Sequence, residues 1–296
     1  MHSRLIRYMI LMTVGSLAML GLVSSAMATE PTGEYKVFNE CPLTASKINS
    51  CVYSLTTSGE VKIGSTSTPI VNPIVFQGGE TREIVELPDE EEIEKRTFVG
   101  AANGETLTKS PQPVPGGLAG LVNCDEISEP VAKLACKLVF ENGLTGVNVT
   151  TELVGSADYS FDRLASREPD GLVMETRLHL ENPLLGSKCY IGSASEPITF
   201  HFTTASPGSP GKAKVLHGGS LIIAEEDSVV DDSFSVPVAN GCGGLLSAAI
   251  DPVIDLKLGL PSASGNNSAT LNGTLEQAGA GAVKANVEEH KKEEEK

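Results

Sequence analysis

Two histidines are the residues of this chain whose type and position could support acid–base or metal chemistry. His179 and His201 each lie in a segment where apolar and polar residues alternate, and each belongs to the polar set. If the two segments were neighbouring strands, the imidazoles could approach each other together with Glu175 or Glu181. A secreted hydrolase with its site around His179 and His201 is therefore the alternative function that the sequence leaves open. A histidine on the polar face of a strand is, however, more often only solvated.

Other catalytic signatures are incomplete. His217–Ser220 has the His-Gly-Gly order of some esterase oxyanion loops, but the chain lacks the G-x-S-x-G turn that those enzymes need. The carboxylates at Asp231–Asp232 and Glu225–Asp227 could suggest a glycosidase, but neighbouring residues of a strand point to opposite faces. Phosphate-binding, dinucleotide-binding and zinc-protease motifs are also missing from the sequence. We therefore expect a role without catalysis and without a bound cofactor.

Carboxylates crowd together between Glu86 and Glu94. Such a run could hold a hard cation such as calcium, but it lacks the alternating Asp or Asn residues around a central glycine that wrap one ion. We interpret it as a mobile acidic loop and predict no metal site.

Six cysteines are distributed along the chain: Cys41, Cys51, Cys124, Cys136, Cys189 and Cys242. An even number in an exported chain favours disulfides, and six cysteines allow 15 pairings. Short loops close at the lowest entropic cost, which favours Cys41 with Cys51 and Cys124 with Cys136, and leaves Cys189 with Cys242. The spacings do not match those of a zinc site. We predict disulfide staples, and no metal ligand or nucleophile among the cysteines.

The first 28 residues predict export. Arg4 and Arg7 precede an apolar run from Tyr8 to Val23, and Ala26–Ala28 forms a cleavage site of small residues. The run is shorter than the roughly 20 residues that a membrane-spanning helix needs. Later in the chain the most apolar segment, Leu245–Leu260, is interrupted by charged residues and a proline. We expect a signal peptide over 1–28 and no transmembrane anchor after its removal.

The composition limits the classes of partner. The chain has 296 residues, 38 acidic against 22 basic side chains, a net charge of -16 and 40% hydrophobic residues. The apolar content suffices for a core, whereas the excess of negative charge argues against nucleic acid and anionic lipid as partners. The expected partner is an unidentified extracellular or cell-surface molecule.

The elements that would position these side chains are mainly strands. Leu172–Glu181 alternates apolar and polar residues over its whole length, and Ile198–Thr203 and Val147–Leu153 do so over shorter stretches. Weaker strand candidates are Cys51–Leu55, Glu60–Gly64, Ile70–Phe76, Thr97–Ala102, Ser220–Ala224 and Phe234–Val238. Short strands separated by many of the 30 glycines and 17 prolines predict a mainly-β fold, an antiparallel β-sandwich or barrel-like domain stapled by disulfides.

Helical spacing is confined to two places. Apolar residues recur at helical intervals between Cys124 and Asn142, with Ser128 as a plausible N-cap, and a shorter candidate spans Leu245–Ile254. The last residues are nearly all charged and carry no apolar stripe. The predicted organisation is a signal peptide over 1–28, a single mainly-β secreted domain over 29–282 and a charged disordered tail over 283–296, the last with a frayed helix as the other possibility.

Several phrases of the chain resemble a family of exported proteins from Gram-positive soil bacteria. They are PGGLAGLVNC at Pro115–Cys124, GLTGVNVTTEL at Gly143–Leu153, LHLENPLLGSKCYIGS at Leu178–Ser193, and NGCGG followed by IDPVIDLKLGLPS within Asn240–Ser262. The resemblance covers most of the chain after the signal peptide. It implies a secreted protein and supports paired cysteines, but the family has no characterised activity, so it assigns no site residue.

Three functions follow from these observations. The expected one is a secreted or cell-envelope-associated protein with a binding or structural role, which predicts an exposed apolar or Asn/Thr-rich face. The hydrolase alternative predicts a concave site where histidines and carboxylates converge. A third possibility, a carrier of an apolar ligand, predicts a cavity inside the sandwich or barrel.

Overall fold

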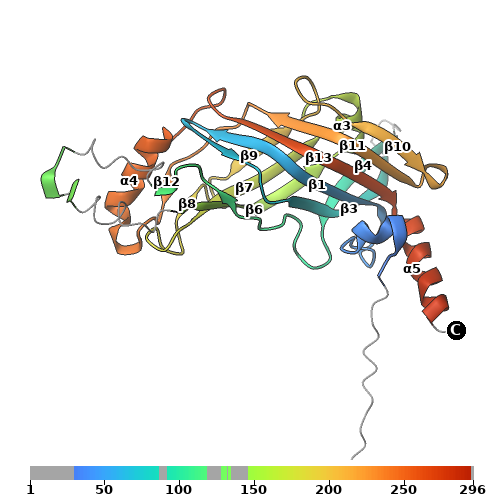
Figure 1. The fold of residues 1–296 in the computed structure, drawn as a ribbon. Helices are drawn as coiled ribbons and strands as arrows, with labels where there is room; N and C mark the ends of the chain where they lie inside the picture. Colours follow the sequence, from blue (N-terminus) through green and yellow to red (C-terminus); the bar gives the residue numbers. More distant parts are fainter. Residues whose placement is uncertain (1–29, 87–91, 119–127, 132, 135–145, 295–296) are drawn as a thin grey trace, which may run out of the picture.

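The computed structural model describes residues 30–86, 92–118, 128–131, 133–134 and 146–294. In these residues the chain forms two antiparallel sheets that pack face to face (Figure 1). The predicted mainly-β, antiparallel, disulfide-stapled fold is confirmed, and it is a sandwich. The predicted signal peptide, 1–28, lies outside the described residues.

The first sheet has seven strands. Its order is β10 (Lys212–Leu216), β11 (Leu221–Asp231), β13 (Ser268–Gly279), β1 (Ile48–Ile63), β3 (Ile74–Glu86) and β4 (Glu92–Gly100), with β2 (Thr66–Pro69) paired to the end of β1. The long strands β1 and β13 pair with each other at the centre of this sheet.

The second sheet has six strands and contains the clearest sequence pattern. Its order is β12 (Ala239–Asn240), β8 (Tyr190–Ile191), β7 (Leu172–Glu181), β6 (Asn148–Tyr159) and β5 (Gln112–Pro113), with β9 (Ile198–Phe202) also paired to β7. Along β7 every second residue is buried, from Leu172 to Leu180. The period-two prediction is therefore confirmed residue by residue.

Register shifts explain why other strands were predicted in pieces or only in part. The register shifts between Thr56 and Ser58 in β1, between Glu225 and Asp227 in β11, and between Leu153 and Ala157 in β6. An extra residue exchanges the inward and outward faces, so the alternation restarts out of phase. β1 was accordingly predicted as two pieces, Cys51–Leu55 and Glu60–Gly64, and β11 only as Ser220–Ala224. One weak candidate was wrong: Phe234–Val238 contributes only an isolated bridge, from Val236 to Ser262.

The described helices are few and short. α4 (Ser247–Leu258) confirms the helix predicted from Leu245, while α3 (Phe161–Ser166) carried no periodic signal. The described 3-10 helices are η1 (Gly33–Phe38), with two turns, and η3 (His217–Gly219) and η4 (Gly244–Leu246), with one turn each. The helix predicted between Cys124 and Asn142 lies outside the described residues except at 128–131 and 133–134. No described helix is both long and apolar enough to cross a membrane.

The C-terminal segment is helical over 280–294, which differs from the predicted disordered tail over 283–296 and agrees with the helix given as the other possibility. α5 (Ala280–Glu294) continues directly from β13 and buries Ala280 and Val283. These residues join η1 in a second apolar cluster on the outer face of the first sheet, and Asn286 accepts a hydrogen bond from the backbone N–H of Thr32 at 2.7 Å. Only the first turn of α5 is buried, and the rest of the helix is charged. The sequence therefore shows no apolar stripe from which this helix could be predicted.

Candidate functional site

The two histidines singled out by the sequence do not meet. β7 and β9 are neighbours, as the hydrolase hypothesis requires, but His201 lies opposite Val173. His179 lies six residues further along β7, which places it about 20 Å away at the rise of a strand. The two imidazoles cannot share a metal ion or a proton.

His179 belongs to a stack on the outer face of the second sheet. Its ring lies 4.5 Å from that of Tyr190, and the Arg177 guanidinium sits 4.0 Å from the centre of the same tyrosine ring. Arg177 donates two hydrogen bonds to Glu152, at 2.9 and 2.7 Å, and the His179 Nδ1 atom lies 3.6 Å from Glu181. The arrangement is an ion-paired ladder across β6, β7 and β8, which supports the sheet.

His201 is held by two carboxylates. Its Nδ1 atom lies 2.8 Å from Asp170, and its backbone N–H donates to Asp231 at 2.7 Å. It lines a hollow together with Ser206, Ser233 and Ser268. None of these serines forms a hydrogen bond with His201 in the described structure.

The remaining sequence candidates have structural partners. The His217 ring contacts Glu34 at 2.5 Å and thereby holds η3 against η1. Glu225 and Glu226 form ion pairs with Lys214 and Lys212 on β10. The adjacent carboxylates therefore cross-link an edge strand and do not form an acid–base pair.

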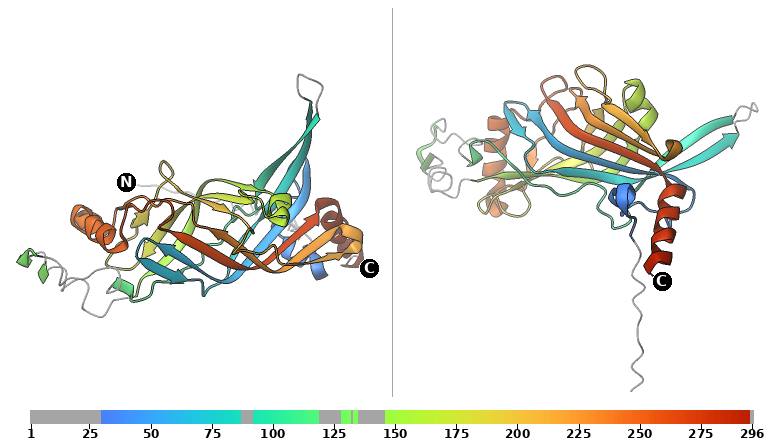
Figure 2. Two further views of the ribbon diagram at one scale, coloured as in Figure 1. Left: turned by 90° about the horizontal axis from the view of Figure 1, so that it is seen from above. Right: turned by 45° about the vertical axis from the view of Figure 1, so that its right-hand side comes forward.

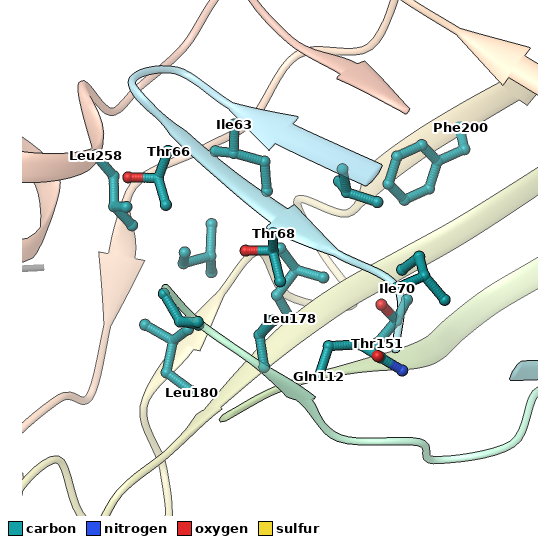
Figure 3. A pocket seen from close by; sticks show the side chains of 14 residues that line it. Ile63, Thr66, Thr68, Ile70, Gln112, Thr151, Leu178, Leu180, Phe200 and Leu258 are labelled. Atoms are coloured by element: carbon teal, nitrogen blue, oxygen red, sulfur yellow. The ribbon is translucent and has the colours of Figure 1, made fainter. Parts of the chain in front are cut away.

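The apolar cavity inside the sandwich is smaller than a usual ligand site. A cavity of about 60 Å³ lies between the β1–β2 hairpin and the inner face of the second sheet (Figure 3). It is lined mainly by apolar side chains, among them Ile63, Ile70, Leu178, Leu180, Phe200 and Leu258. Small-molecule sites usually enclose roughly 300 to 1,000 Å³, so the carrier hypothesis gains no support from this cavity.

Asp227 points into the core because of the β11 bulge. Simple alternation from Leu221, which faces outward against η1, would place Asp227 on the outer face as well. The extra residue, Glu226 at φ 58°, turns the Asp227 side chain inward. There it is 7% exposed and lines a cavity of about 40 Å³, and its Oδ1 atom has no hydrogen-bond partner in the described structure. Burial raises the pKa of Asp227 to about 7.

Glu80 is a second inward-facing acid, on β3. Its Oε2 atom accepts hydrogen bonds from Ser50 at 2.9 Å and from Gln277 at 3.4 Å, whereas Oε1 has no partner among the described residues. Burial raises its pKa above the usual range, and the Ser50 hydrogen bond opposes this. The sequence indicates Asp227 only as part of the Glu225–Asp227 run of carboxylates and does not single out Glu80. Neither acid was predicted to be buried, because nothing in the local pattern distinguishes them from surface acids.

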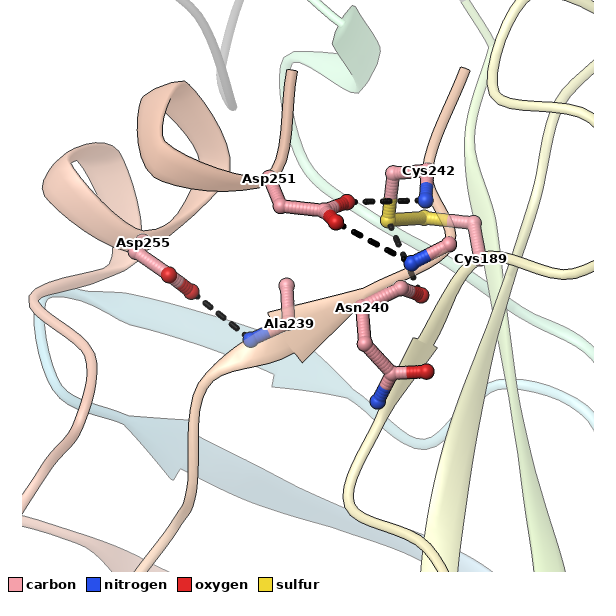
Figure 4. Close-up of a disulfide and its surroundings, with 7 residues drawn as sticks. Cys189, Ala239, Asn240, Cys242, Asp251 and Asp255 are labelled. Atoms are coloured by element: carbon pink, nitrogen blue, oxygen red, sulfur yellow. Dashed lines mark hydrogen bonds between the residues drawn. A yellow bond between two sulfur atoms is a disulfide. The ribbon is translucent and has the colours of Figure 1, made fainter. Parts of the chain in front are cut away.

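Two of the three predicted disulfides are confirmed, Cys41–Cys51 and Cys189–Cys242. The predicted pair of Cys124 and Cys136 lies outside the described residues. Around Cys242, two acids of α4 reinforce the link (Figure 4). Asp251 accepts hydrogen bonds from the N–H groups of Gly241 and Cys242 at 3.1 and 2.8 Å, and Asp255 accepts one from Ala239 at 2.7 Å.

Asp251→Ala is expected to lower the free energy of unfolding by about 1 to 3 kcal/mol, because two backbone donors would lose a charged acceptor. The measurement is urea denaturation at pH 7. The control is Asp232→Ala at an exposed position, which should change stability by less than about 0.5 kcal/mol. Equal losses in the two variants would contradict the role given to Asp251.

The same end of the sandwich presents apolar side chains to solvent. Leu245 and Leu246 of η4 and Leu256 of α4 are all exposed. A binding protein is expected to have an exposed apolar surface of this kind.

A hairpin projects from the opposite end. The distal parts of β3 and β4, residues 81–86 and 92–97, extend beyond the body of the sandwich (Figure 2). Consecutive residues such as Arg82, Glu83 and Ile84 are exposed, so neither face of the hairpin packs on a core. The predicted loop over Glu86–Glu94 is wrong at its ends, since Glu86 and Glu92–Glu94 belong to the strands.

Ion pairs hold the hairpin in place. Glu94 contacts Arg82 and Arg96, each at 2.6 Å, and Lys47 contacts Glu83 at 2.7 Å. The hydrogen bond from Lys47 lowers the pKa of Glu83, and that from Arg96 lowers the pKa of Glu94. At its base, Arg96 reaches Asp162 of α3 at 3.0 Å and so connects the hairpin to the second sheet.

The structure and the comparisons assign no catalytic or metal centre. In the part of the chain that the structure describes, no three His, Cys, Asp or Glu side chains are grouped so that they could hold a metal ion. No family model, no curated protein and no solved structure matches the chain.

Proposed function

We propose that the protein is exported and acts outside the cell or at the cell envelope as a binding protein, with the projecting β3–β4 hairpin as its contact element. The two disulfides support an oxidising environment, which is where such bonds form and persist. The observation that carries the binding role is the exposure of both faces of the hairpin.

The hairpin contributes little to the stability of the sandwich. A two-stranded hairpin without a covering layer is marginally stable in water, and each exposed ion pair adds only about 0 to 1 kcal/mol. Residues 81–86 and 94–97 contribute no side chain to the main core. The projecting strands therefore place a charged surface away from the body of the sandwich, where a partner can contact it.

The charge of the hairpin indicates a cationic partner. Residues 81–97 contain seven acidic and three basic side chains. Glu94 already engages two of the basic side chains, Arg82 and Arg96. The hairpin thus offers excess carboxylates, which would attract a protein surface rich in amine or guanidinium groups.

A shortened variant tests this function. Replacing Arg82–Arg96 by Asn-Gly would join Thr81 to Thr97, which face each other in the register, through a two-residue turn. We expect the fold to persist and binding to isolated cell envelopes, or to immobilised poly-lysine, to fall at least tenfold at low salt. Wild-type binding should also weaken as salt is added, because exposed charges are screened.

The matched control removes the same net charge elsewhere. Changing Glu288, Glu289, Glu293 and Glu294 of α5 to glutamine also deletes four negative charges. We expect this variant to bind within about twofold of wild type, because the contact depends on the charges of the hairpin and not on the net charge of the protein. Equal losses in both variants, or unchanged binding by the shortened chain, would exclude the hairpin as the contact element.

A further inference from the structure

A polar hollow lies where the two sheets join. Directly after β9 of the second sheet, Thr203 forms an isolated bridge with Val230 of β11 in the first sheet. The hollow that these two residues help to line has a volume of about 690 Å³, which falls within the roughly 300 to 1,000 Å³ of small-molecule sites. We propose that this hollow binds a primary amine that also carries hydroxyl groups, of about the size of an amino sugar.

A buried carboxylate fixes the wall of the hollow. Asp231 is only 4% exposed, and its Oδ2 atom accepts a hydrogen bond from the backbone N–H of His201 at 2.7 Å. Its Oδ1 atom accepts from the backbone N–H and the hydroxyl group of Ser233, at 2.8 and 2.7 Å. Thr203 donates to the backbone carbonyl of Glu168 at 2.8 Å and so holds the loop before β7. The wall is therefore ordered before a ligand arrives, which lowers the entropic cost of binding.

Other polar groups of the wall remain available to a ligand. Asp170 holds the His201 Nδ1 atom with one carboxylate oxygen, at 2.8 Å, so its second oxygen and the His201 Nε2 atom have no partner among the described residues. The Asp232 carboxylate is likewise without a partner in the described structure. The same holds there for three hydroxyl groups, those of Ser206, Ser268 and Thr270. Each of these groups can exchange a water molecule for a hydrogen bond to a ligand.

The charge of the wall selects the kind of ligand. The described lining residues include three aspartates and no lysine or arginine, so a cation is favoured over an anion. The carboxylates are not grouped for a metal ion, since no three His, Cys, Asp or Glu side chains in the described part of the chain could hold one. An organic cation with its own hydrogen-bond donors satisfies separated carboxylates better.

The other lining groups narrow the class further. No Phe, Tyr or Trp is among the described lining residues, so the aromatic cage that binds quaternary ammonium groups is missing. A primary ammonium group fits instead, because it donates three hydrogen bonds. The hydroxyl groups of the wall can both donate to and accept from hydroxyl groups of the ligand. None of the described lining residues belongs to β3 or β4, so this site is separate from the hairpin.

Titration of the whole protein with glucosamine tests the site. At pH 7 and low salt, we expect saturable shifts in the amide NMR signals of His201, Ser206 and Ser268, and none over residues 81–86 of the hairpin. Glucose has a hydroxyl group in place of the ammonium group, and cyclohexylamine keeps the ring and the charge without the hydroxyl groups. Each should bind about tenfold or more weakly than glucosamine, because each lacks hydrogen bonds that the wall offers.

Variants separate binding from folding. Asp170→Asn and Asp232→Asn should each weaken glucosamine binding about tenfold or more, because a charged acceptor is lost. Asp232 has no described side-chain partner to lose, so its variant should keep the urea midpoint of wild type. Glu196→Gln is the matched control, an exposed acid next to β9 but outside the hollow, and should bind within about twofold of wild type.

Three results would overturn the proposal. The first is the absence of saturable shifts around the hollow with glucosamine. The second is equal affinity for glucosamine and either analogue, which would exclude a role for the ammonium or the hydroxyl groups. The third is unchanged affinity in both aspartate variants, or an equal loss in the Glu196→Gln control.

Discussion

Between pH 4 and pH 8, the free energy of unfolding of Asp227→Asn is expected to rise by about 4 kcal/mol relative to that of wild type. The folded pKa of Asp227 is about 7, against an ordinary value of 3.8. Between these values the unfolded chain releases a proton that the folded chain retains. The stability contributed by this group is therefore fully present below about pH 4, falls as the pH rises to about 7, and is constant above it.

The measurement is urea denaturation of both proteins at several pH values. The quantity of interest is the change in their difference with pH, because any constant cost of the buried amide then cancels. Glu80 and Glu276 also have raised pKa values, so the variant should retain a smaller fall of the same sign. A difference that stays constant from pH 4 to pH 8 would show that Asp227 is not held as a neutral acid.

Removing the Cys189–Cys242 disulfide should lower the free energy of unfolding by an amount similar to the gain predicted for Asp227→Asn. The two cysteines are fully buried, and their bond closes a separation of 53 residues. Loop-closure entropy assigns such a crosslink about 4 kcal/mol. The Cys189→Ser, Cys242→Ser double variant should therefore unfold at a clearly lower urea concentration.

The other described disulfide is the matched control. Cys41–Cys51 has a sequence separation of 10, for which the same relation assigns about 3 kcal/mol. Its double serine variant should therefore lose about 1.5 kcal/mol less stability than the Cys189→Ser, Cys242→Ser variant. If the shorter link proved the more important, the ordering by loop length would be wrong for this fold.

The sequence predicts those elements whose burial follows a simple period. β7 is half-buried over its whole length without a bulge, so alternation identifies it fully. The nearest-neighbour pairing of cysteines also holds for both described disulfides. The alternation of β7 and the Cys41–Cys51 pairing depend on local spacing, and the Cys189–Cys242 pairing follows as the remaining pair.

The features that remained hidden depend on contacts between distant segments. Asp227 faces inward only because a bulge shifts the register of β11 against β13. The hairpin carries no alternation, since both of its faces are exposed, and its acidic residues therefore resemble a loop. In α5, burial of Ala280 and Val283 against η1 anchors a helix whose remaining residues are charged.

The histidine prediction illustrates the same limit. Alternation placed His179 and His201 on polar strand faces, and the strands are indeed neighbours. Their register, which the alternation of a single strand does not specify, separates the imidazoles. Each histidine instead pairs with carboxylates in its own surroundings, Glu181 for His179 and Asp170 for His201.

Site-specific photo-crosslinking is the most direct test of the hairpin as contact element. A photoreactive amino acid would replace Ile84 in the hairpin or, in a control, Val71 before the other end of β3; both side chains are 53% exposed. After illumination on isolated cell envelopes, we predict a discrete adduct with a cationic protein from position 84 and none from position 71. Absence of an adduct at position 84, or equal yields from both positions, would contradict the proposed function.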